Sequence, residues 1–265
     1  MDLLHLILLG LVQGLTEFLP ISSSAHLVLL PHLLGWEDQG LVYDIAAHLG
    51  SLFAVVIYFK KDLQGMFSAW TASINGGPAT NESYLMWYLL VATLPVAVIG
   101  YTSYSFVALW FRSPVIIAIA TIFFGLLLWW ADVSSKRQRQ VTDLKMKDSI
   151  LIGLAQAIAL IPGTSRSGIT MTAGLMLGFD RTTAARFSFL LAIPTIVLAG
   201  GHEVYRFFIP GVKIDILAFC TVLFVSAISA WFAIKYFLKF LENTGMLPYV
   251  VYRFLLGSVL IYLFL

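Results

Sequence analysis

The fold of this chain is decided by two similar stretches, ILLGLVQGL at residues 7–15 and ILIGLAQAI at residues 150–158, which differ only by exchanges among small and apolar residues. Each stretch runs into a proline and a turn rich in hydroxyl groups, PISSSAH at residues 20–26 and PGTSRSG at residues 162–168. Apolar segments interrupted by Gly or Pro at matching positions of two halves are typical of membrane proteins that build one site from both halves. The sequence therefore predicts an internal repeat whose two turns carry the functional groups.

The composition is that of an integral membrane protein. The chain has 265 residues, of which 60% are hydrophobic and 11% charged, with a mean hydropathy of +0.90. This leaves too little polar surface for a water-soluble globule. A net charge of +2 gives no reason to expect a nucleic-acid partner, and the single cysteine, Cys220, excludes an internal disulfide. We expect membrane lipids to surround most of the chain.

Apolar runs predict the membrane-spanning helices, which need about 20 residues each. The segments of that length are residues 41–59, 84–105, 114–132, 183–205, 214–239 and 247–265. Stretches 61–83 and 133–147 are expected to be soluble, and no separate soluble domain is expected.

The two segments that contain the repeated stretches do not form ordinary spans. Each consists of two short apolar halves, residues 3–19 with 25–35 and residues 148–161 with 168–179, joined by the polar turn. Non-helical backbone at membrane depth is tolerated only where protein or a cavity surrounds it. We therefore predict an all-α polytopic membrane protein with six transmembrane helices and two re-entrant helical hairpins.

The basic residues predict how the chain is oriented. They fall in alternate loops, which the positive-inside rule places in the cytoplasm. These residues are Lys60, Lys61, Lys136, Arg137, Arg139, Lys145, Lys147, Arg181, Lys235 and Lys239. Both termini are then outside, and the two hairpins enter from opposite sides. The single domain 1–265 would consist of inverted repeats, about 1–132 and 148–265, whose turns meet near the membrane centre.

The first turn offers groups for acid–base and nucleophilic chemistry. Gln13 and Glu17 are four residues apart and share a helix face. Three serines, residues 22–24, and His26 follow beyond the Pro20 break. A carboxylate, hydroxyl groups and an imidazole are thus expected in one cluster.

The second turn is suited to binding an anion. Arg166 lies in a Gly- and Ser-rich segment just ahead of a helix whose first turn includes Thr170. Backbone N–H groups and the helix dipole bind anions at such a place, and the Arg fork matches phosphate. The two turns together predict a phosphate pocket facing a nucleophile and a base.

At these residues the chain resembles the bacterial undecaprenyl-diphosphate phosphatases, also called bacitracin-resistance proteins. The resemblance covers essentially the full length, and its paired motifs are specific. The matching segments are Gln13 to Pro20, Ser22 to His26, Pro162 to Gly168, Phe187 to Pro194 and Tyr252-Arg253. It implies a similar fold in the bacterial inner membrane and an enzyme that removes the terminal phosphate from a C55 lipid diphosphate. It also implies the monophosphate carrier as product. The oligomeric state is left open, and a homodimer is compatible with the sequence.

The resemblance also implies roles for particular residues. Glu17, Ser23, His26 and Arg166 are expected to be catalytic. Among the residues expected to bind substrate, Ser165, Thr170 and Arg253 come from the resemblance, while Gln13, Gly163 and Ser167 are expected from their places beside the two turns. Many members carry a second glutamate where this chain has Gln13, which removes one carboxylate from a two-carboxylate metal site. A carboxylate beside an anion still favours a divalent cation, so we expect Mg²⁺ or Ca²⁺ at Glu17.

Each assignment has a structural alternative. Arg166 could be a buried charge paired with Glu17, although ionisable groups at membrane depth are usually functional. Ser23 could cap the helix that follows it, and His26 could be an interior histidine. For His48, core packing is favoured over a place in the cavity. Arg253 could extend toward the membrane interface.

A transporter of polyprenyl phosphate is the alternative function. Broken helices that meet at the midplane also bind anions in secondary transporters. The enzyme is favoured because a carrier needs anion donors but neither a nucleophile nor a base. The sequence leaves open whether Ser23, His26 or an activated water attacks the phosphorus.

Overall fold

The computed structural model describes residues 2–36, 40–110, 113–207 and 215–265. Within these ranges the chain is all helical, with eleven α-helices, one short 3-10 helix and no strand. The helices are α1 (Leu3–Glu17), α2 (Ser23–Leu34), α3 (Leu41–Tyr58), α4 (Lys60–Ile74), α5 (Asn81–Trp110), α6 (Pro114–Ser134), η1 (Val141–Asp143), α7 (Met146–Ile158), α8 (Arg166–Met176), α9 (Arg181–Phe207), α10 (Ile216–Thr244) and α11 (Leu247–Phe264).

All six predicted spans coincide with helices, apart from residue 214, which lies outside the described ranges. Five of these helices, α5, α6, α9, α10 and α11, are each long and apolar enough to cross a membrane. The sixth, α3, continues after a bend of 74° into α4, and only the bent pair passes the same test. The stretch 61–83, predicted to be soluble, is therefore largely helical.

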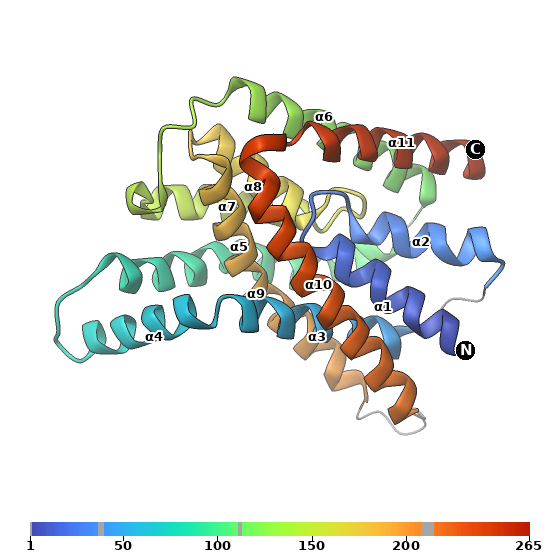
Figure 1. The fold of residues 1–265 in the computed structure, drawn as a ribbon, viewed down its shortest axis with the longest axis horizontal. Coiled ribbons are helices and arrows are strands. Elements are labelled where there is room, and N and C mark those ends of the chain that lie inside the picture. Colours follow the sequence, from blue (N-terminus) through green and yellow to red (C-terminus); the bar gives the residue numbers. More distant parts are fainter. Residues whose placement is uncertain (1, 37–39, 111–112, 208–214) are drawn as a thin grey trace.

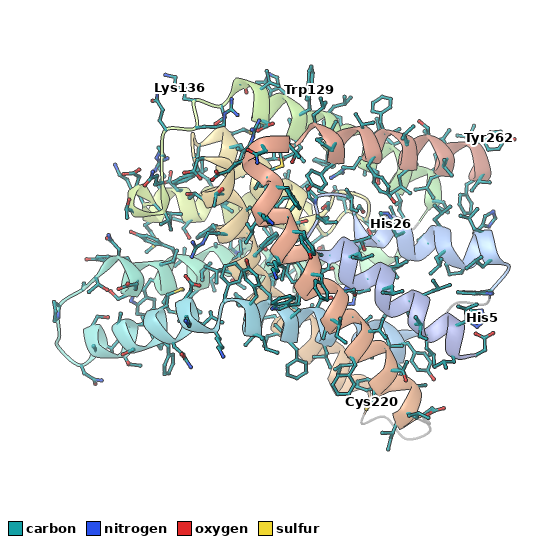
Figure 2. The ribbon with its side chains drawn as sticks, viewed as in Figure 1. His5, His26, Trp129, Lys136, Cys220 and Tyr262 are labelled. Carbon is teal, nitrogen blue, oxygen red and sulfur yellow. The ribbon has the colours of Figure 1, made fainter. Side chains whose placement is uncertain are left out.

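Apolar side chains cover the outside of the molecule. Along α6, for example, Ile119, Phe123, Leu126 and Trp130 are between 44% and 57% exposed. Figure 2 shows Trp129 and Tyr262 pointing away from the protein. An apolar surface of this extent is stable only against lipid, so the fold is that of a multi-pass membrane protein.

The two repeated stretches form two helical hairpins, α1 with α2 and α7 with α8. Each is interrupted by its turn, and the two turns lie together in the middle of the molecule (Figure 1). Ser22 and Ser165 occupy the N-cap positions of α2 and α8, and both have a φ of 70°. Positive φ is uncommon for residues other than glycine and marks a constrained backbone. The same unusual geometry thus occurs at matching positions of both copies.

The glycines of the repeated motif allow each hairpin to approach a neighbouring helix closely. A Cβ added at Gly14 of α1 would meet Ser229 and the Ser226 carbonyl of α10. A Cβ added at Gly153 of α7 would lie 2.5 Å from the Ala92 carbonyl oxygen of α5. Small residues at helix contacts are what membrane packing requires, because backbones approach there.

Arg139, in the loop before the second hairpin, bonds both helices of that hairpin. Its guanidinium bonds Asp148 at the start of α7, at 2.5 and 3.1 Å, and the Leu177 carbonyl after α8, at 2.9 Å. Its backbone N–H donates to the Gly178 carbonyl at 3.0 Å. Hydrogen bonding to Asp148 raises the pKa of Arg139, so the cation persists at every physiological pH.

Replacing Gly14 by alanine should destabilise the protein, because the new methyl group collides with α10. Overpacking of this kind typically costs about 1–3 kcal/mol. The matched control is Gly65→Ala on α4, where nothing lies within 4 Å of the added Cβ and alanine favours the helix. Thermal unfolding of the two purified variants measures the difference. A Gly14→Ala protein that melts with the wild type would contradict the close approach.

Candidate active site where the two hairpin turns meet

Reciprocal hydrogen bonds join the two turns. The backbone N–H of Gly163 donates to Ser24 Oγ at 3.1 Å, and Ser167 Oγ donates to the Leu19 carbonyl at 2.9 Å. Ser24 and Ser167 occupy matching positions of the two copies. Each turn thus uses the same hydroxyl position to bind the backbone of the other, which makes the pair of turns one structural unit.

Arg253 of α11 contacts both turns and is fully buried. Its guanidinium donates to backbone carbonyls of Thr121, Pro20, Gly163 and Thr164, at 2.8, 3.3, 3.0 and 3.0 Å. It therefore does not extend toward the membrane interface, which the sequence allowed. These bonds connect α6, α11 and both turns. The substrate-binding role expected for Arg253 stays a prediction.

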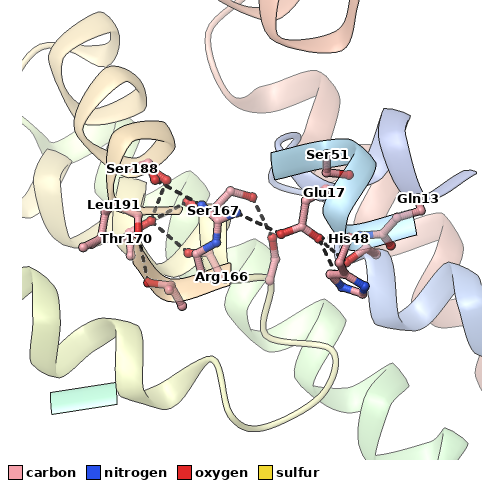
Figure 3. A network of polar contacts seen from close by, with 12 residues as sticks. Gln13, Glu17, His48, Ser51, Arg166, Ser167, Thr170, Ser188 and Leu191 are labelled. Carbon is pink, nitrogen blue, oxygen red and sulfur yellow. Dashed lines mark hydrogen bonds and ion pairs between the residues drawn. The ribbon is translucent and has the colours of Figure 1, made fainter. Parts of the chain in front are cut away.

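An ion pair crosses the contact between the turns. Arg166, the first residue of α8, donates to Glu17 Oε1 at 2.9 Å and to the Ser188 carbonyl at 3.0 Å. Figure 3 shows the two charged side chains facing each other. They are 12% and 9% exposed. The pairing considered from the sequence is thus present, and it puts the cation of one hairpin on the carboxylate of the other.

The second carboxylate oxygen of Glu17 accepts hydrogen bonds from two side chains of the first hairpin. Gln13 Nε2 donates to Oε2 at 2.9 Å, and Ser23 Oγ donates to the same atom at 3.2 Å. The cap position of α2 belongs to Ser22, so the helix-capping alternative for Ser23 is wrong. The Ser23 hydroxyl instead donates its proton to the Glu17 carboxylate, and its expected role as nucleophile stays a prediction.

His48 of α3 belongs to this cluster, so the preference for core packing at this position was wrong. Its Nε2 lies 3.9 Å from Glu17 Oε2, and its side chain is 39% exposed. Its Nδ1 is 2.8 Å from the Asp44 carbonyl, which can only accept, so Nδ1 carries a proton. In the neutral ring the Nε2 lone pair then faces the site. The signal available in the sequence was an ionisable side chain within an apolar helix.

The remaining predicted residues support Arg166 or shape its turn. Thr170 Oγ1 bonds the Arg166 carbonyl at 2.8 Å and Ser188 Oγ at 2.7 Å. Ser165 Oγ accepts from Gly168 N–H at 3.1 Å and lies 3.2 Å from Ser167 Oγ. Ser188, which sequence reasoning did not select, therefore holds Arg166 both directly and through Thr170.

His26 lies near the start of α2 (Figure 2) and contacts α11. Its Nδ1 lies 2.8 Å from the Ser22 carbonyl, and its Nε2 lies 2.7 Å from the hydroxyl of Tyr252. The structure thus places His26 in the same turn as Ser23 but bonds it to a different helix. Its expected role in proton transfer stays a prediction.

The family model described as bacitracin resistance protein BacA matches residues 6–259. The chain belongs to the BacA family. A protein of Stutzerimonas stutzeri named undecaprenyl-diphosphatase 2 is 54% identical over 100% of this chain and 99% of its own length. Proteins named undecaprenyl-diphosphatase from Nitrosococcus oceani and Chromohalobacter salexigens are 52% and 50% identical. They align with 100% and 98% of this chain, and with the same shares of their own lengths.

In this BacA protein, Arg253→Lys should lower stability sharply. A lysine ammonium cannot serve carbonyls on three segments at once, and each buried carbonyl left unpaired costs about 1–3 kcal/mol. Thermal unfolding in detergent measures the loss, with Arg137→Lys in the exposed loop as the matched control. Equal melting of the two variants would show that Arg253 does not hold the turns together.

Proposed function

We propose that this BacA protein hydrolyses undecaprenyl diphosphate to undecaprenyl phosphate and inorganic phosphate. The reaction would recycle the lipid carrier for peptidoglycan synthesis and confer bacitracin resistance. The observation that carries the proposal is the Glu17–Arg166 pair at the contact of the turns, with the Ser23 hydroxyl donating to the same carboxylate. The names of the relatives support the same substrate.

Phosphate recognition is assigned to the second turn. Arg166 supplies a planar fork for phosphate oxygens, and it stands at the first position of α8, where the helix dipole favours an anion. Gly163, Ser165 and Ser167 shape the turn, while Thr170 and Ser188 fix Arg166 from behind. The prenyl chain remains in the lipid.

Proton handling is assigned to the first hairpin. The Ser23 proton already points at Glu17 Oε2, so Glu17 can accept it as Ser23 Oγ bonds to the terminal phosphorus. The anhydride P–O bond breaks, and undecaprenyl phosphate leaves. Water then releases inorganic phosphate from Ser23; in the alternative course, a water activated by Glu17 attacks directly. His26 is the second proton-transfer group. Phosphoryl transfer of either kind depends chiefly on positioning and charge stabilisation.

A divalent cation, Mg²⁺ or Ca²⁺, fits beside Glu17. Gln13 Oε1 is buried and has no hydrogen-bond partner in the described part of the chain, so an oxygen ligand is free next to the carboxylate. No group of three His, Cys, Asp or Glu side chains suited to a metal occurs among the described residues. Glu17 and Gln13 would therefore hold the cation together with substrate oxygens, as is usual for Mg²⁺. When bound, it neutralises diphosphate charge.

We also propose the membrane arrangement. The hairpins are re-entrant, the halves are inverted repeats, and six helices cross the bacterial inner membrane with both termini outside. The matched φ values of Ser22 and Ser165 and the reciprocal bonds of Ser24 and Ser167 support the repeat. The transporter alternative is not carried forward, because the nucleophile and base have no task in a carrier.

Arg166→Ala should reduce phosphate release from undecaprenyl diphosphate at least 100-fold, the loss typical of a missing charge-stabilising group. Arg186→Ala is the matched control, because Arg186 of α9 is exposed and pairs with Asp62 of α4. A malachite-green assay on protein that elutes as folded in gel filtration measures both. Near-normal release by Arg166→Ala would refute the assignment.

Removing divalent cations should stop turnover. EDTA is expected to abolish phosphate release, and added Mg²⁺ or Ca²⁺ should restore it, because the diphosphate charge would otherwise face Glu17 unshielded. In Glu17→Gln, metal affinity measured by calorimetry should fall together with activity. Full turnover in EDTA would exclude the cation.

A further inference from the structure

His26 Nε2 is hydrogen-bonded to the hydroxyl of Tyr252 in α11, close to the C-terminal end of the chain. The Ser22 carbonyl accepts a hydrogen bond, so His26 Nδ1 must carry the proton of that 2.8 Å contact. Neutral His26 therefore has an unprotonated Nε2, and at 2.7 Å the Tyr252 hydroxyl donates to it. The two rings also lie parallel, at 6° and 5.5 Å between centroids.

We propose that Tyr252 is the positioning residue for His26 in the phosphatase reaction. The proposal rests on the proposed function, in which His26 transfers a proton. Histidine chemistry requires one defined tautomer and one ring orientation. Ser22 and Tyr252 together fix both, and they leave Nε2 as the basic nitrogen.

The bond between the two rings can reverse without ionising the phenol. When Nε2 takes the proton released by the attacking water, the Tyr252 hydroxyl keeps its own proton, turns away and accepts a hydrogen bond from the new N–H. Tyr252 is 43% exposed, so the residue as a whole is not sealed within the core.

The location of Tyr252 is set by the residue that follows it. Arg253 is buried and bonds the carbonyls of Pro20, Gly163 and Thr164. The backbone of α11 at this point is therefore fixed relative to both turns. A phenol attached there reaches His26 with little freedom, which is the condition for an effective positioning contact.

A double-mutant cycle tests the proposal. Tyr252→Phe should lower kcat about tenfold, as expected when a proton-transfer group loses its alignment, with KM changed less than twofold. In a His26→Gln background the same substitution should cause no further loss. Tyr249→Phe is the matched control, since Tyr249 lies on the same helix and packs against Phe237. Equal losses in both backgrounds would overturn the proposal.

A chemical readout tests the contact without turnover. Diethyl pyrocarbonate modifies the free imidazole nitrogen, and mass spectrometry of the peptide containing His26 follows its rate. The rate should rise several-fold in Tyr252→Phe and stay unchanged in Tyr249→Phe. An unchanged rate in Tyr252→Phe would overturn the proposal, because Nε2 would then not be covered by the phenol.

The two measurements also separate failure of this proposal from failure of the function. If the wild type releases no phosphate, the proposed function fails, while the modification rates still report the contact. If the wild type is active and His26→Gln is equally active, His26 transfers no proton and the positioning role is overturned.

Discussion

The guanidinium of Arg253 donates to carbonyls in both hairpin turns and in α6, and the rest of the site depends on these bonds. Turns placed among membrane helices expose carbonyls that lipid cannot satisfy. One side chain with five donors meets several of them at once. Ser24 and Ser167 meet two further groups across the contact. The polar backbone of the interruptions is thus stabilised by the protein itself, which permits irregular structure where chemistry needs it.

The site is assembled from both hairpins and could not exist in either alone. The first hairpin contributes the carboxylate and hydroxyl, and the second contributes the cation and the turn amides. α3 adds His48, and α9 adds Ser188. The hairpins approach neighbouring helices closely at Gly14 and Gly153, so helix packing places the two turns and the polar groups beside them.

The sequence predicted much of this arrangement, and its failures have physical reasons. Long apolar runs and the repeated motif predicted the six helices and two hairpins, because these depend on local pattern. Helix α4 was missed because it begins with Lys60, Lys61 and Asp62 and is not a continuous apolar run. His48 was assigned to the core because its neighbour, Glu17, lies on another helix. The clamp formed by Arg253 was also invisible, since backbone carbonyls that accept its bonds leave no signature in the sequence.

The ion pair of Glu17 and Arg166 has a consequence for selectivity. In the ligand-free protein Arg166, the proposed phosphate-binding residue, is paired with Glu17, the proposed base. A ligand must outcompete a buried carboxylate for Arg166, which neutral and zwitterionic lipids do poorly, whereas a diphosphate carries the charge to do so. Arrival of the right headgroup and release of the base are then one event. In the proposed reaction, the substrate would thus free the base by binding, whereas a headgroup with too little charge would leave Glu17 paired with Arg166.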